Sequence, residues 1–337
     1  MSPRKPSVTA QDVARLAGVS RAVVSRALSS NGSISPDARA RVLRAAEELG
    51  YQVNFLAQGL NRQRSHLIGV IVSRISDPFR SALLDALLNE IQRQGFQALV
   101  SEIHSEQDLA HTLRRFTQFR VSGVIVTSGQ PPEAVVNECV QQHIPVVGIN
   151  RQPTIPGVDY VCSDNVAGAE LAADQLLRSG CRRFGWLNHS PSTWAGRMRG
   201  EAFSRALQAR GVDVERNLAI LACPEEGYTG GFQAAALADE ALEGIFCANA
   251  QIACGFLDGM RQRGKQAPED YQLIGFDNTP PTAQYSYQLT TLHQDVAAIS
   301  RQALARLQER TVDPLQPSRT TWVEVTLIHR RTSPFII

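Results

Sequence analysis

Two spacings of apolar residues divide the chain into two parts. In about the first fifty residues, apolar positions recur three and four residues apart and predict short helices over 10–17, 21–29 and 37–49. From residue 66 onward, apolar runs of strand length alternate with helical stretches. Such alternation predicts parallel sheets with helices on both faces. The pattern therefore predicts a small helical head followed by a larger α/β body.

The body contains two series of predicted strands and helices. The predicted strands are 66–73, 96–102, 122–128, 145–150, 183–189, 218–223, 243–249 and 271–277. The predicted helices lie near 79–94, 106–119, 132–142, 198–210, 228–237 and 251–263. Ligands of parallel sheets bind beyond the carboxyl ends of the strands, and two such halves placed face to face form a cleft that closes about a hinge. We therefore expect a ligand site between two subdomains.

The three predicted helices of the head carry capping residues at their expected starts. Thr9 and Ser20 precede the first two helices, and Ser35 precedes the third, which has Pro36 in its first turn. Gly18 suits the tight turn between the first two helices. Two helices joined by a short glycine-containing turn and packed on a third form a helix-turn-helix unit. Such a unit lays the start of its second helix in the major groove of DNA.

The second helix carries residue types that read DNA. Arg21, Ala22 and Arg26 lie on one predicted exposed face. An arginine can bind guanine O6 and N7 through two hydrogen bonds, and an alanine can touch the methyl group of thymine. Hydroxyls that can donate to phosphates, and so position the head, are those of Thr9, Ser20, Ser25 and Ser35. The alternative is a helical bundle whose surface arginines serve only solubility.

The distribution of charge supports the DNA-binding interpretation of the head. Residues 1–66 hold ten Lys and Arg against four Asp and Glu, whereas the rest of the chain holds twenty-four against twenty-eight. A basic head on a mildly acidic body indicates a nucleic-acid-binding segment joined to a part that binds something else.

Several classes of protein are disfavoured by what the sequence lacks. It has no apolar run of membrane-spanning length, and its first residues, "MSPRKPSV", are not those of a signal peptide, so we expect a cytoplasmic protein. Its six cysteines form no CxxC pair and no Cys/His cluster, which predicts buried thiols and no metal site. No phosphate-binding glycine loop or nucleophile motif is present, so we expect neither a cofactor nor an enzyme. The dispersed histidines are expected to be structural or at the surface: His104, His111, His143, His189, His293 and His329.

The head sequence "VTAQDVARLAGVSRAVVSRALSSNGSISPDARARVLRAAEELGYQVN" resembles the DNA-binding head of the lactose-repressor/galactose-repressor (LacI/GalR) family. That family's pattern is T-x-x-D-V-A-x-x-A-G-V-S-x-x-T-V-S-R-x-L-N, followed by G-Y-x-x-N. Here Val23 stands where threonine is common, and Ser29 stands where asparagine is common. These departures concern individual contacts and leave the predicted fold of the head unchanged.

The resemblance also assigns a role to the segment "NFLAQGLNRQRS", residues 54–65. In the family this segment is a hinge helix that orders on DNA and inserts a leucine into the minor groove. By alignment that leucine is Leu60, with Asn54 and Ala57 at their usual places. Gly59 lowers helix propensity by roughly 1 kcal/mol relative to alanine. Because so short a helix is unstable alone in water, we expect it to form only with DNA.

The body resembles the family's effector-binding part, whose fold is similar to that of the periplasmic sugar-binding proteins. The motifs that carry this resemblance are "DPF" at 77–79, "VSGVIV" at 121–126, "VCSDNVAG" at 161–168, "CAN" at 247–249, "LIGFDN" at 273–278 and "LTTLHQD" at 289–295. The resemblance implies three chain crossings between subdomains, near 161–164, 290–295 and 316–320. The expected organisation is a head (1–53), a hinge (54–65), a first subdomain (66–163 with 294–317) and a second subdomain (164–293 with 318–337).

Effector contacts are implied at the ends of the strands. Asp277 resembles the family's acidic acceptor of sugar hydroxyls, and Arg199 stands where the family has an arginine that binds ligand oxygens across the cleft. Asn150 and Asn249 are further polar strand-end groups, and Phe79 offers an apolar face to a sugar ring. The weaker candidates are Ser73 and Glu226.

Two arginines depart from the family's usual pattern. Arg80 follows Phe79, and Arg151 follows Asn150. Guanidinium groups match carboxylates and phosphates. If both arginines point into the cleft beside Arg199, the site favours an anion such as a sugar acid or a sugar phosphate. The alternative for Arg80 is a position in solvent.

The expected protein is a homodimeric transcriptional regulator, a repressor of carbohydrate-catabolism genes. Its two heads read near-palindromic double-stranded operator DNA, and a small sugar-like effector between the subdomains changes its DNA affinity. A corepressor-dependent regulator of the purine type remains open. So does a sugar-binding protein of a transport system, which suits the body but has no use for the basic head.

Overall fold

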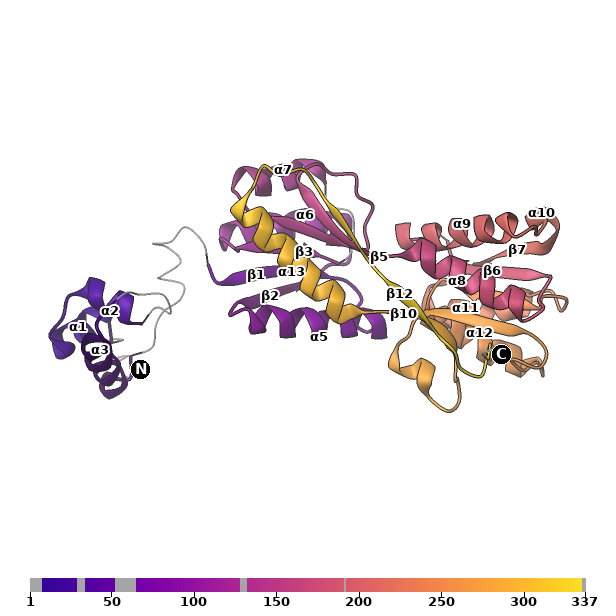
Figure 1. The fold of residues 1–337 in the computed structure, drawn as a ribbon, viewed down its shortest axis with the longest axis horizontal. Helices are drawn as coiled ribbons and strands as arrows, with labels where there is room; N and C mark the ends of the chain where they lie inside the picture. The colour runs from indigo at the N-terminus through magenta and orange to yellow at the C-terminus, as the bar shows by residue number, and fades with distance from the viewer. Residues whose placement is uncertain (1–7, 29–33, 52–64, 128–131, 191, 335–337) are drawn as a thin grey trace, which may run out of the picture. The chain divides into compact units, whose positions relative to one another are not determined.

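The computed structural model describes residues 8–28, 34–51, 65–127, 132–190 and 192–334. It divides the chain into two units, a head that ends at Ser65 and a body that begins at His66. The head is helical, and the body contains two six-stranded sheets with helices packed on them (Figure 1). The predicted α/β fold class is therefore confirmed.

The head folds as three helices around a small apolar core. The helices are α1 (Ala10–Ala17), α2 (Arg21–Ala27) and α3 (Pro36–Leu49). The side-chain oxygens of Thr9, Ser20 and Ser35 accept hydrogen bonds from the backbone N–H groups of Asp12, Val23 and Ala38, so all three predicted caps are present. Gly18 has the left-handed conformation that the turn requires, with φ of 63°. The buried core consists of Val13, Ala14, Ala17, Val24, Ala27, Val42, Ala45 and Ala46.

The first sheet of the body is entirely parallel, with strand order β11-β5-β4-β3-β1-β2. Its strands are β1 (Leu67–Val72), β2 (Gln97–Glu102), β3 (Gly123–Val126), β4 (Val146–Ile149), β5 (Val158–Ser163) and β11 (Thr320–Val323). Helices α6 (Glu106–Gln118) and α7 (Glu133–Gln141) contribute to one apolar cluster. Helices α5 (Pro78–Arg93) and α13 (Val296–Val312) contribute to another. This sheet and these helices form the first subdomain.

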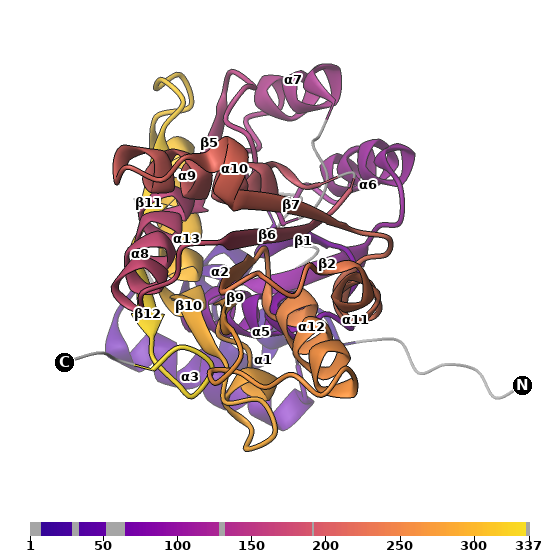
Figure 2. The same cartoon turned by 90° about the vertical axis from the view of Figure 1, so that its right-hand side faces the viewer.

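The second sheet has the order β12-β10-β9-β8-β6-β7, and only β12 runs antiparallel to its neighbour. Its strands are β6 (Phe184–His189), β7 (Leu218–Cys223), β8 (Gly244–Cys247), β9 (Gln272–Asp277), β10 (Thr290–Gln294) and β12 (Val325–Ile328). In Figure 2, helices α8 (Asn165–Arg178) and α9 (Trp194–Ala209) lie on one side of this sheet, and α11 (Gly227–Leu237) and α12 (Ala250–Gln262) lie on the other. Together with the short helices α10 (Val214–Asn217) and η1 (Pro280–Ala283), they form the second subdomain.

The chain passes between the two subdomains three times, at Asp164, at Asp295 and at Glu324. The third crossing lies beyond the predicted 316–320, and the assignment of residues 318–323 to the second subdomain is wrong. Strand β11 pairs with β5 in the first sheet, from Thr320 opposite Tyr160 to Val323 opposite Ser163. Val323 and Val325 are both buried but in different cores. The apolar pattern therefore does not show where the chain changes subdomain.

A buried ion pair fastens the end of α13 to the first sheet. The guanidinium of Arg310 donates two hydrogen bonds to the carboxylate of Asp159 on β5, at 2.7 and 2.8 Å. These side chains are 4% and 1% exposed. Arg310 also donates to the carbonyl oxygens of Pro314, Gln316 and Pro317, and so holds the chain that leads to β11. Good geometry of this kind offsets the cost of burying both charges.

Two tryptophans meet where the subdomains adjoin. Trp194 begins α9 in the second subdomain but packs against an apolar cluster of the first. Its ring centroid lies 6.4 Å from that of Trp322 on β11. Aromatic rings at this separation attract one another.

Helices α11 and α12 pack with their backbones unusually close because glycines lie between them. A Cβ atom at Gly255 would lie 1.9 Å from the carbonyl oxygen of Tyr228. We expect Gly255→Ala to lower the free energy of unfolding by about 3 kcal/mol, because the helices must separate to admit the methyl group. Gly185→Ala is the control, since its Cβ would meet side chains no nearer than 3.4 Å. Urea unfolding followed by circular dichroism would measure both, and equal effects would contradict the prediction.

Two general features bear on the function of the body. Within the described ranges, no helix is long and apolar enough to cross a membrane. All six cysteines are buried and unpaired, and burial raises the pKa of their thiols. Buried thiols of this kind behave as small apolar side chains.

Candidate functional site

Helix α2 presents the predicted DNA-reading residues to solvent. Arg21, Ala22, Ser25 and Arg26 are all exposed, whereas Val24 and Ala27 on the opposite face are buried. The Nε atom of Arg26 donates a hydrogen bond to the carbonyl oxygen of Ala22 at 3.3 Å. The helix therefore offers two cations and two short side chains on one exposed surface, as a helix that enters the major groove requires.

The predicted phosphate contacts divide into two kinds. The side-chain oxygens of Ser20 and Ser35 accept hydrogen bonds in the caps of α2 and α3. Accepting such a bond leaves a hydroxyl proton available for donation to a phosphate. The hydroxyl of Thr9 instead donates to the carboxylate of Asp12 at 2.7 Å in a capping box. A phosphate contact by the Thr9 hydroxyl would break that bond. The predicted hinge contacts, Asn54, Ala57 and Leu60, lie outside the described residues.

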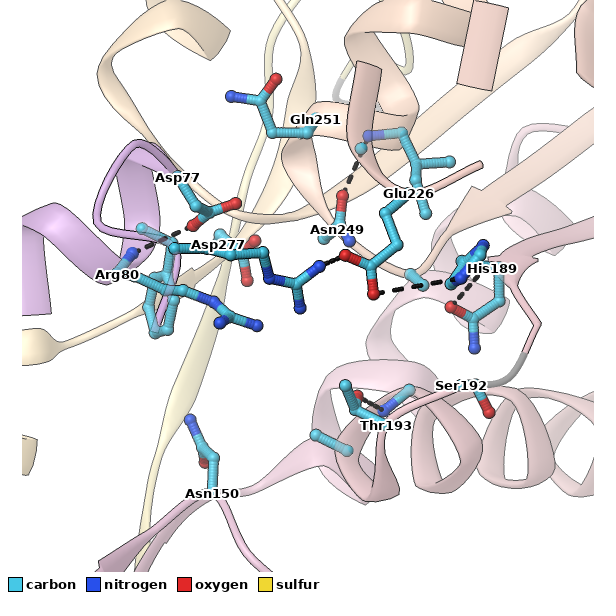
Figure 3. Close-up of a pocket in the computed structure, with 18 of the residues that line it drawn as sticks. Asp77, Arg80, Asn150, His189, Ser192, Thr193, Glu226, Asn249, Gln251 and Asp277 are labelled. Atoms are coloured by element: carbon cyan, nitrogen blue, oxygen red, sulfur yellow. Dashed lines mark hydrogen bonds and ion pairs between the residues drawn. The ribbon is translucent and has the colours of Figure 1, made fainter. Parts of the chain in front are cut away.

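A cavity of about 380 Å³ lies between the two subdomains of the body (Figure 3). The first subdomain contributes the start of α5 and the ends of β1, β3 and β4. The second subdomain contributes the ends of β6, β8 and β9 and the starts of α9, α11 and α12. Eight of the nine residues predicted to contact an effector line this cavity: Phe79, Arg80, Asn150, Arg151, Arg199, Glu226, Asn249 and Asp277.

Ser73 is the predicted residue that does not line the cavity. Its hydroxyl and carbonyl oxygens accept hydrogen bonds from Nη1 of Arg80. The structure therefore places Ser73 behind Arg80, where it orients the guanidinium. Arg80 itself is not in open solvent, and in Figure 3 it extends from α5 into the cavity on the side opposite His189 and Thr193.

Arg199 makes several contacts at the wall of the cavity. It is 6% exposed, and its guanidinium donates to the side-chain oxygen of Asn165 at 2.7 Å and to the carbonyl oxygen of Ala248 at 2.6 Å. Its guanidinium carbon lies 3.4 Å from the centroid of the Phe276 ring, and its Nη1 lies 3.7 Å from a carboxylate oxygen of Asp277. Burial lowers the pKa of Arg199 to about 10, so the side chain is still a cation at neutral pH.

Gln294, at the crossing between β10 and α13, joins the two subdomains through its side-chain amide. Its Nε2 donates to Asp277 of the second subdomain at 2.6 Å. Its oxygen accepts from the side-chain amide of Asn150 at 3.2 Å and from the hydroxyl of Ser163, both in the first subdomain. A ligand that bonds to Asp277 or Asn150 therefore acts on the contact that ties the subdomains together.

Several strand ends at the cavity adopt the left-handed backbone conformation. Arg74, Asn150 and Asp277 have φ values of 49°, 52° and 86°. Residues other than glycine rarely adopt such angles, and residues that do so cluster at functional sites. The conformation turns the chain sharply after β1, β4 and β9, which leaves polar side chains at the edge of each sheet.

The carboxyl group of Asp277 is the most perturbed acid in the cavity. Burial, opposed by the nearby Arg199 and reinforced by Asp77, raises its pKa from 3.8 to about 6. Between these two values the folded chain keeps a proton that the unfolded chain has lost. The contribution of this group to stability is therefore complete below pH 3.8 and is lost as the pH rises through about 6.

Asp277→Asn should remove this pH dependence. We compare the free energies of unfolding of the native sequence and of Asp277→Asn at each pH. From pH 4 to pH 7 we expect the native sequence to lose up to about 3 kcal/mol relative to the variant. Urea unfolding at several pH values would measure the difference. A difference that does not change with pH would contradict the raised pKa of Asp277.

An ion pair joins the two subdomains across the cavity. Arg74, which follows β1, pairs with Glu226, the N-cap of α11. The Nε2 atom of His189 lies 3.9 Å from the other oxygen of Glu226. His189 was predicted to be structural or at the surface, and the structure instead places it in the lining of the cavity.

Several polar residues of the cavity were not predicted from the sequence. Asn188 and His189 are the last two residues of β6. They are polar residues at a strand end, as Asn150 and Asp277 are, so the same sequence signal predicts Asn188 and His189 as well. Thr193 caps α9, since its side-chain oxygen accepts a hydrogen bond from the N–H of Gly196 at 3.1 Å. A threonine before a helix is typical of an ordinary cap and does not by itself indicate a place in the cavity. The remaining missed polar or charged residues are Arg74, Ser76, Asp77, Thr127, Ser192, Gln251 and Gln294.

The arrangement is that of a binding site. Its polar groups come from many strand and helix ends, and the described residues contain no cluster of three or more potential metal ligands. Carboxylate, amide and guanidinium groups around a small cavity suit a hydroxylated ligand of about monosaccharide size, since ligand cavities of roughly 300–1,000 Å³ are usual.

Comparisons with known proteins agree with both parts of this architecture. The model of "Bacterial regulatory proteins, lacI family" matches residues 9–54, and that of "Periplasmic binding protein-like domain" matches residues 173–333. The transcriptional regulator GalS of Salmonella typhimurium is 31% identical over 329 residues, which cover 96% of each chain.

Two solved structures extend the comparison. The lac repressor dimer bound to operator and the anti-inducer ONPF has the same fold, with a TM-score of 0.83 at 22% identity, covering 98% of this chain and 100% of that one. A LacI family regulator from Enterococcus faecium with bound ribose has a TM-score of 0.72 at 26% identity, covering 80% of this chain and 100% of that one. The relatives are transcriptional regulators rather than enzymes. The chain belongs to the LacI family of bacterial regulatory proteins, and it is a DNA-binding transcriptional regulator with an effector-binding body.

Proposed function

We propose that the chain is a homodimeric repressor of carbohydrate-catabolism genes. In this proposal its two heads bind a near-palindromic operator through α2, and a sugar-like effector bound between the subdomains weakens that binding. The two-fold axis of a dimer matches that of a palindromic site, so each head reads one half-site.

The observation that carries the proposal is the composition of the cavity wall. Its polar groups come from both subdomains, and Gln294 bonds to both. A ligand that fills this cavity has a different affinity for arrangements in which the two walls are closer or farther apart. Such differential affinity is the only means by which a ligand can shift an equilibrium between two states.

The lining supports a hydroxylated effector. Asp277 can accept hydrogen bonds from hydroxyl groups, Arg199 and Asn249 can donate them, and Phe79 offers an apolar surface. The amide oxygen of Asn249 accepts from the N–H of Ile252 at 2.9 Å, so its amino group can face a ligand. The ribose bound to the Enterococcus relative belongs to the same chemical class.

DNA binding with and without candidate effectors tests the proposal. An operator would first be obtained by selection from random duplexes, and its affinity for the full chain would be measured by fluorescence anisotropy at physiological salt. Sugars and sugar derivatives that raise the thermal stability of the chain would then be added. We expect at least one to weaken operator binding by about 5- to 150-fold, the usual range of allosteric coupling.

Each other outcome has a distinct meaning. If an effector tightens operator binding, that effector is a corepressor, and the proposed relief of repression by the effector is wrong. No preference for any palindromic duplex, or no effect of any bound sugar on DNA affinity, would contradict the proposal.

A further inference from the structure

Three arginines gather on the wall of the cavity that the first subdomain provides. Arg74 follows β1, Arg80 lies in the first turn of α5, and Arg151 follows β4. They are near enough to disfavour one another's charge. Burial and then Arg80 and Arg74 lower the pKa of Arg151 to about 10. Burial and then Arg74 lower the pKa of Arg80, and Asp77 and Asp277 oppose that shift. Like charges in a partly buried wall are unfavourable unless an anion lies among them.

Arg151 is the member of this cluster whose charge is least compensated. Its Nη2 donates to the carbonyl oxygen of Thr127, but its Nε is buried and makes no hydrogen bond within the described part of the chain. No carboxylate of the described residues lies within ion-pair distance of it. A guanidinium without a counter-charge in a partly buried wall is costly, which indicates that a bound anionic group supplies the missing charge.

The carboxylates of the cavity already have partners. Glu226 pairs with Arg74. Asp77 accepts the backbone N–H of Arg80 as the N-cap of α5, at 3.0 Å. Asp277 is bonded to Gln294 and lies beside Arg199. These acids therefore do not supply the counter-charge that Arg151 lacks.

We propose that the effector is a hydroxylated organic anion, a sugar acid or a sugar phosphate, whose acidic group binds to Arg151 and Arg80. Its hydroxyl groups then face Asp277, Asn249 and Arg199 on the opposite wall. Guanidinium groups bind planar carboxylates and phosphates through paired hydrogen bonds, so either acid fits this wall. The inference rests on the proposed function, since it concerns the chemistry of the same effector.

Isothermal titration calorimetry with matched compounds tests the inference. The full chain would be titrated with D-glucose, D-galactose, D-mannose and D-ribose, and with the aldonic acid, the uronic acid and the terminal phosphate of each. We expect at least one acid or phosphate to bind tenfold or more tightly than its neutral sugar. A carboxylate that binds best would identify a sugar acid, and a phosphate that binds best would identify a sugar phosphate.

Arg151→Gln provides the decisive variant. It removes the charge but keeps an amide that can donate to Thr127, and we expect it to abolish the tenfold preference for the anion. It should also raise the melting temperature of the ligand-free chain, because an uncompensated buried charge is removed. The matched control is Arg114→Gln in the exposed pair with Glu138, which removes the same charge from the same subdomain away from the cavity. The control should retain the preference for the anion.

Three results would overturn the inference. They are a neutral sugar that binds as tightly as its acid and phosphate, a panel in which no acid or phosphate binds, and an anion preference that survives in Arg151→Gln. If a neutral sugar binds as tightly as its acid and phosphate and also changes operator affinity, the anionic effector is excluded while the proposed function stands.

Discussion

Replacement of Arg310 with methionine is expected to lower the free energy of unfolding by about 3–5 kcal/mol. The carboxylate of Asp159 is 1% exposed, and the substitution would leave it without its counter-charge. Three carbonyl oxygens in residues 314–317 would also lose the hydrogen bonds that Arg310 donates. Urea unfolding followed by circular dichroism would measure the loss.

An exposed pair of the same chemistry provides the control. Arg331 and Glu269 are 61% and 58% exposed, with 3.4 Å between the charged atoms. Arg331→Met should change the free energy of unfolding by less than about 1 kcal/mol. The double variant Asp159→Asn with Arg310→Met should recover part of the loss, because no buried charge is then left unpaired. Equal effects of Arg310→Met and Arg331→Met would show that burial of the pair is not decisive.

Arg26→Ala is expected to weaken operator binding by about 30-fold or more, because one base-contacting arginine provides about 1–3 kcal/mol of discrimination and a dimer carries two heads. Arg26 is exposed on α2, so the substitution removes a surface side chain and leaves the core of the head intact. Arg21→Ala should act in the same way. Fluorescence anisotropy with the selected operator and with a random duplex would measure both affinity and specificity.

Arg41→Ala separates the loss of a base contact from the loss of a charge. Arg41 lies on α3 and pairs with Asp37 at 3.6 Å. Its removal should weaken binding to operator and random duplexes to the same small extent, because a cation away from the bases contributes only to phosphate attraction. A selective loss of operator affinity in Arg41→Ala, but not in Arg26→Ala, would place the reading surface on α3 instead of α2.

The head could be predicted almost residue by residue because its signals are local. Each helix start is marked by a hydroxyl side chain that accepts a hydrogen bond from the backbone N–H three residues ahead, and Gly18 marks a turn that needs a left-handed residue. The strands of the body with continuous apolar runs were equally clear. In these segments the capping and turn residues indicate the same elements as the spacing of apolar residues, so the sequence alone is enough to predict them.

Strands with buried polar residues were not predicted. Strand β5 contains Asp159, whose burial is possible only because Arg310, 151 residues later, pairs with it. Strand β10 contains Thr290, whose hydroxyl bonds to the carbonyl oxygens of Arg330 and Ser333. Partners so distant in sequence leave no local pattern. The other elements that were not predicted are β11, β12, α8, α10, α13 and η1. Of these, α13 does carry a local signal, because its buried residues Ile299, Ala303 and Leu307 recur four residues apart.

The cavity was predictable only in part, for a similar reason. Polar residues at the ends of apolar strands, such as Asn150 and Asp277, could be found because topology brings such ends together. Arg74 and Gln294 could not, because their importance comes from partners on the other subdomain. The role of Ser73 behind Arg80 likewise depends on a side-chain direction that sequence does not reveal.

The contact between Trp194 and Trp322 gives the chain a built-in optical reporter. The sequence has three tryptophans, and the third, Trp186, is buried within the second subdomain. Emission from the other two therefore depends on how closely the subdomains approach, and effector titrations can follow that approach without any attached dye.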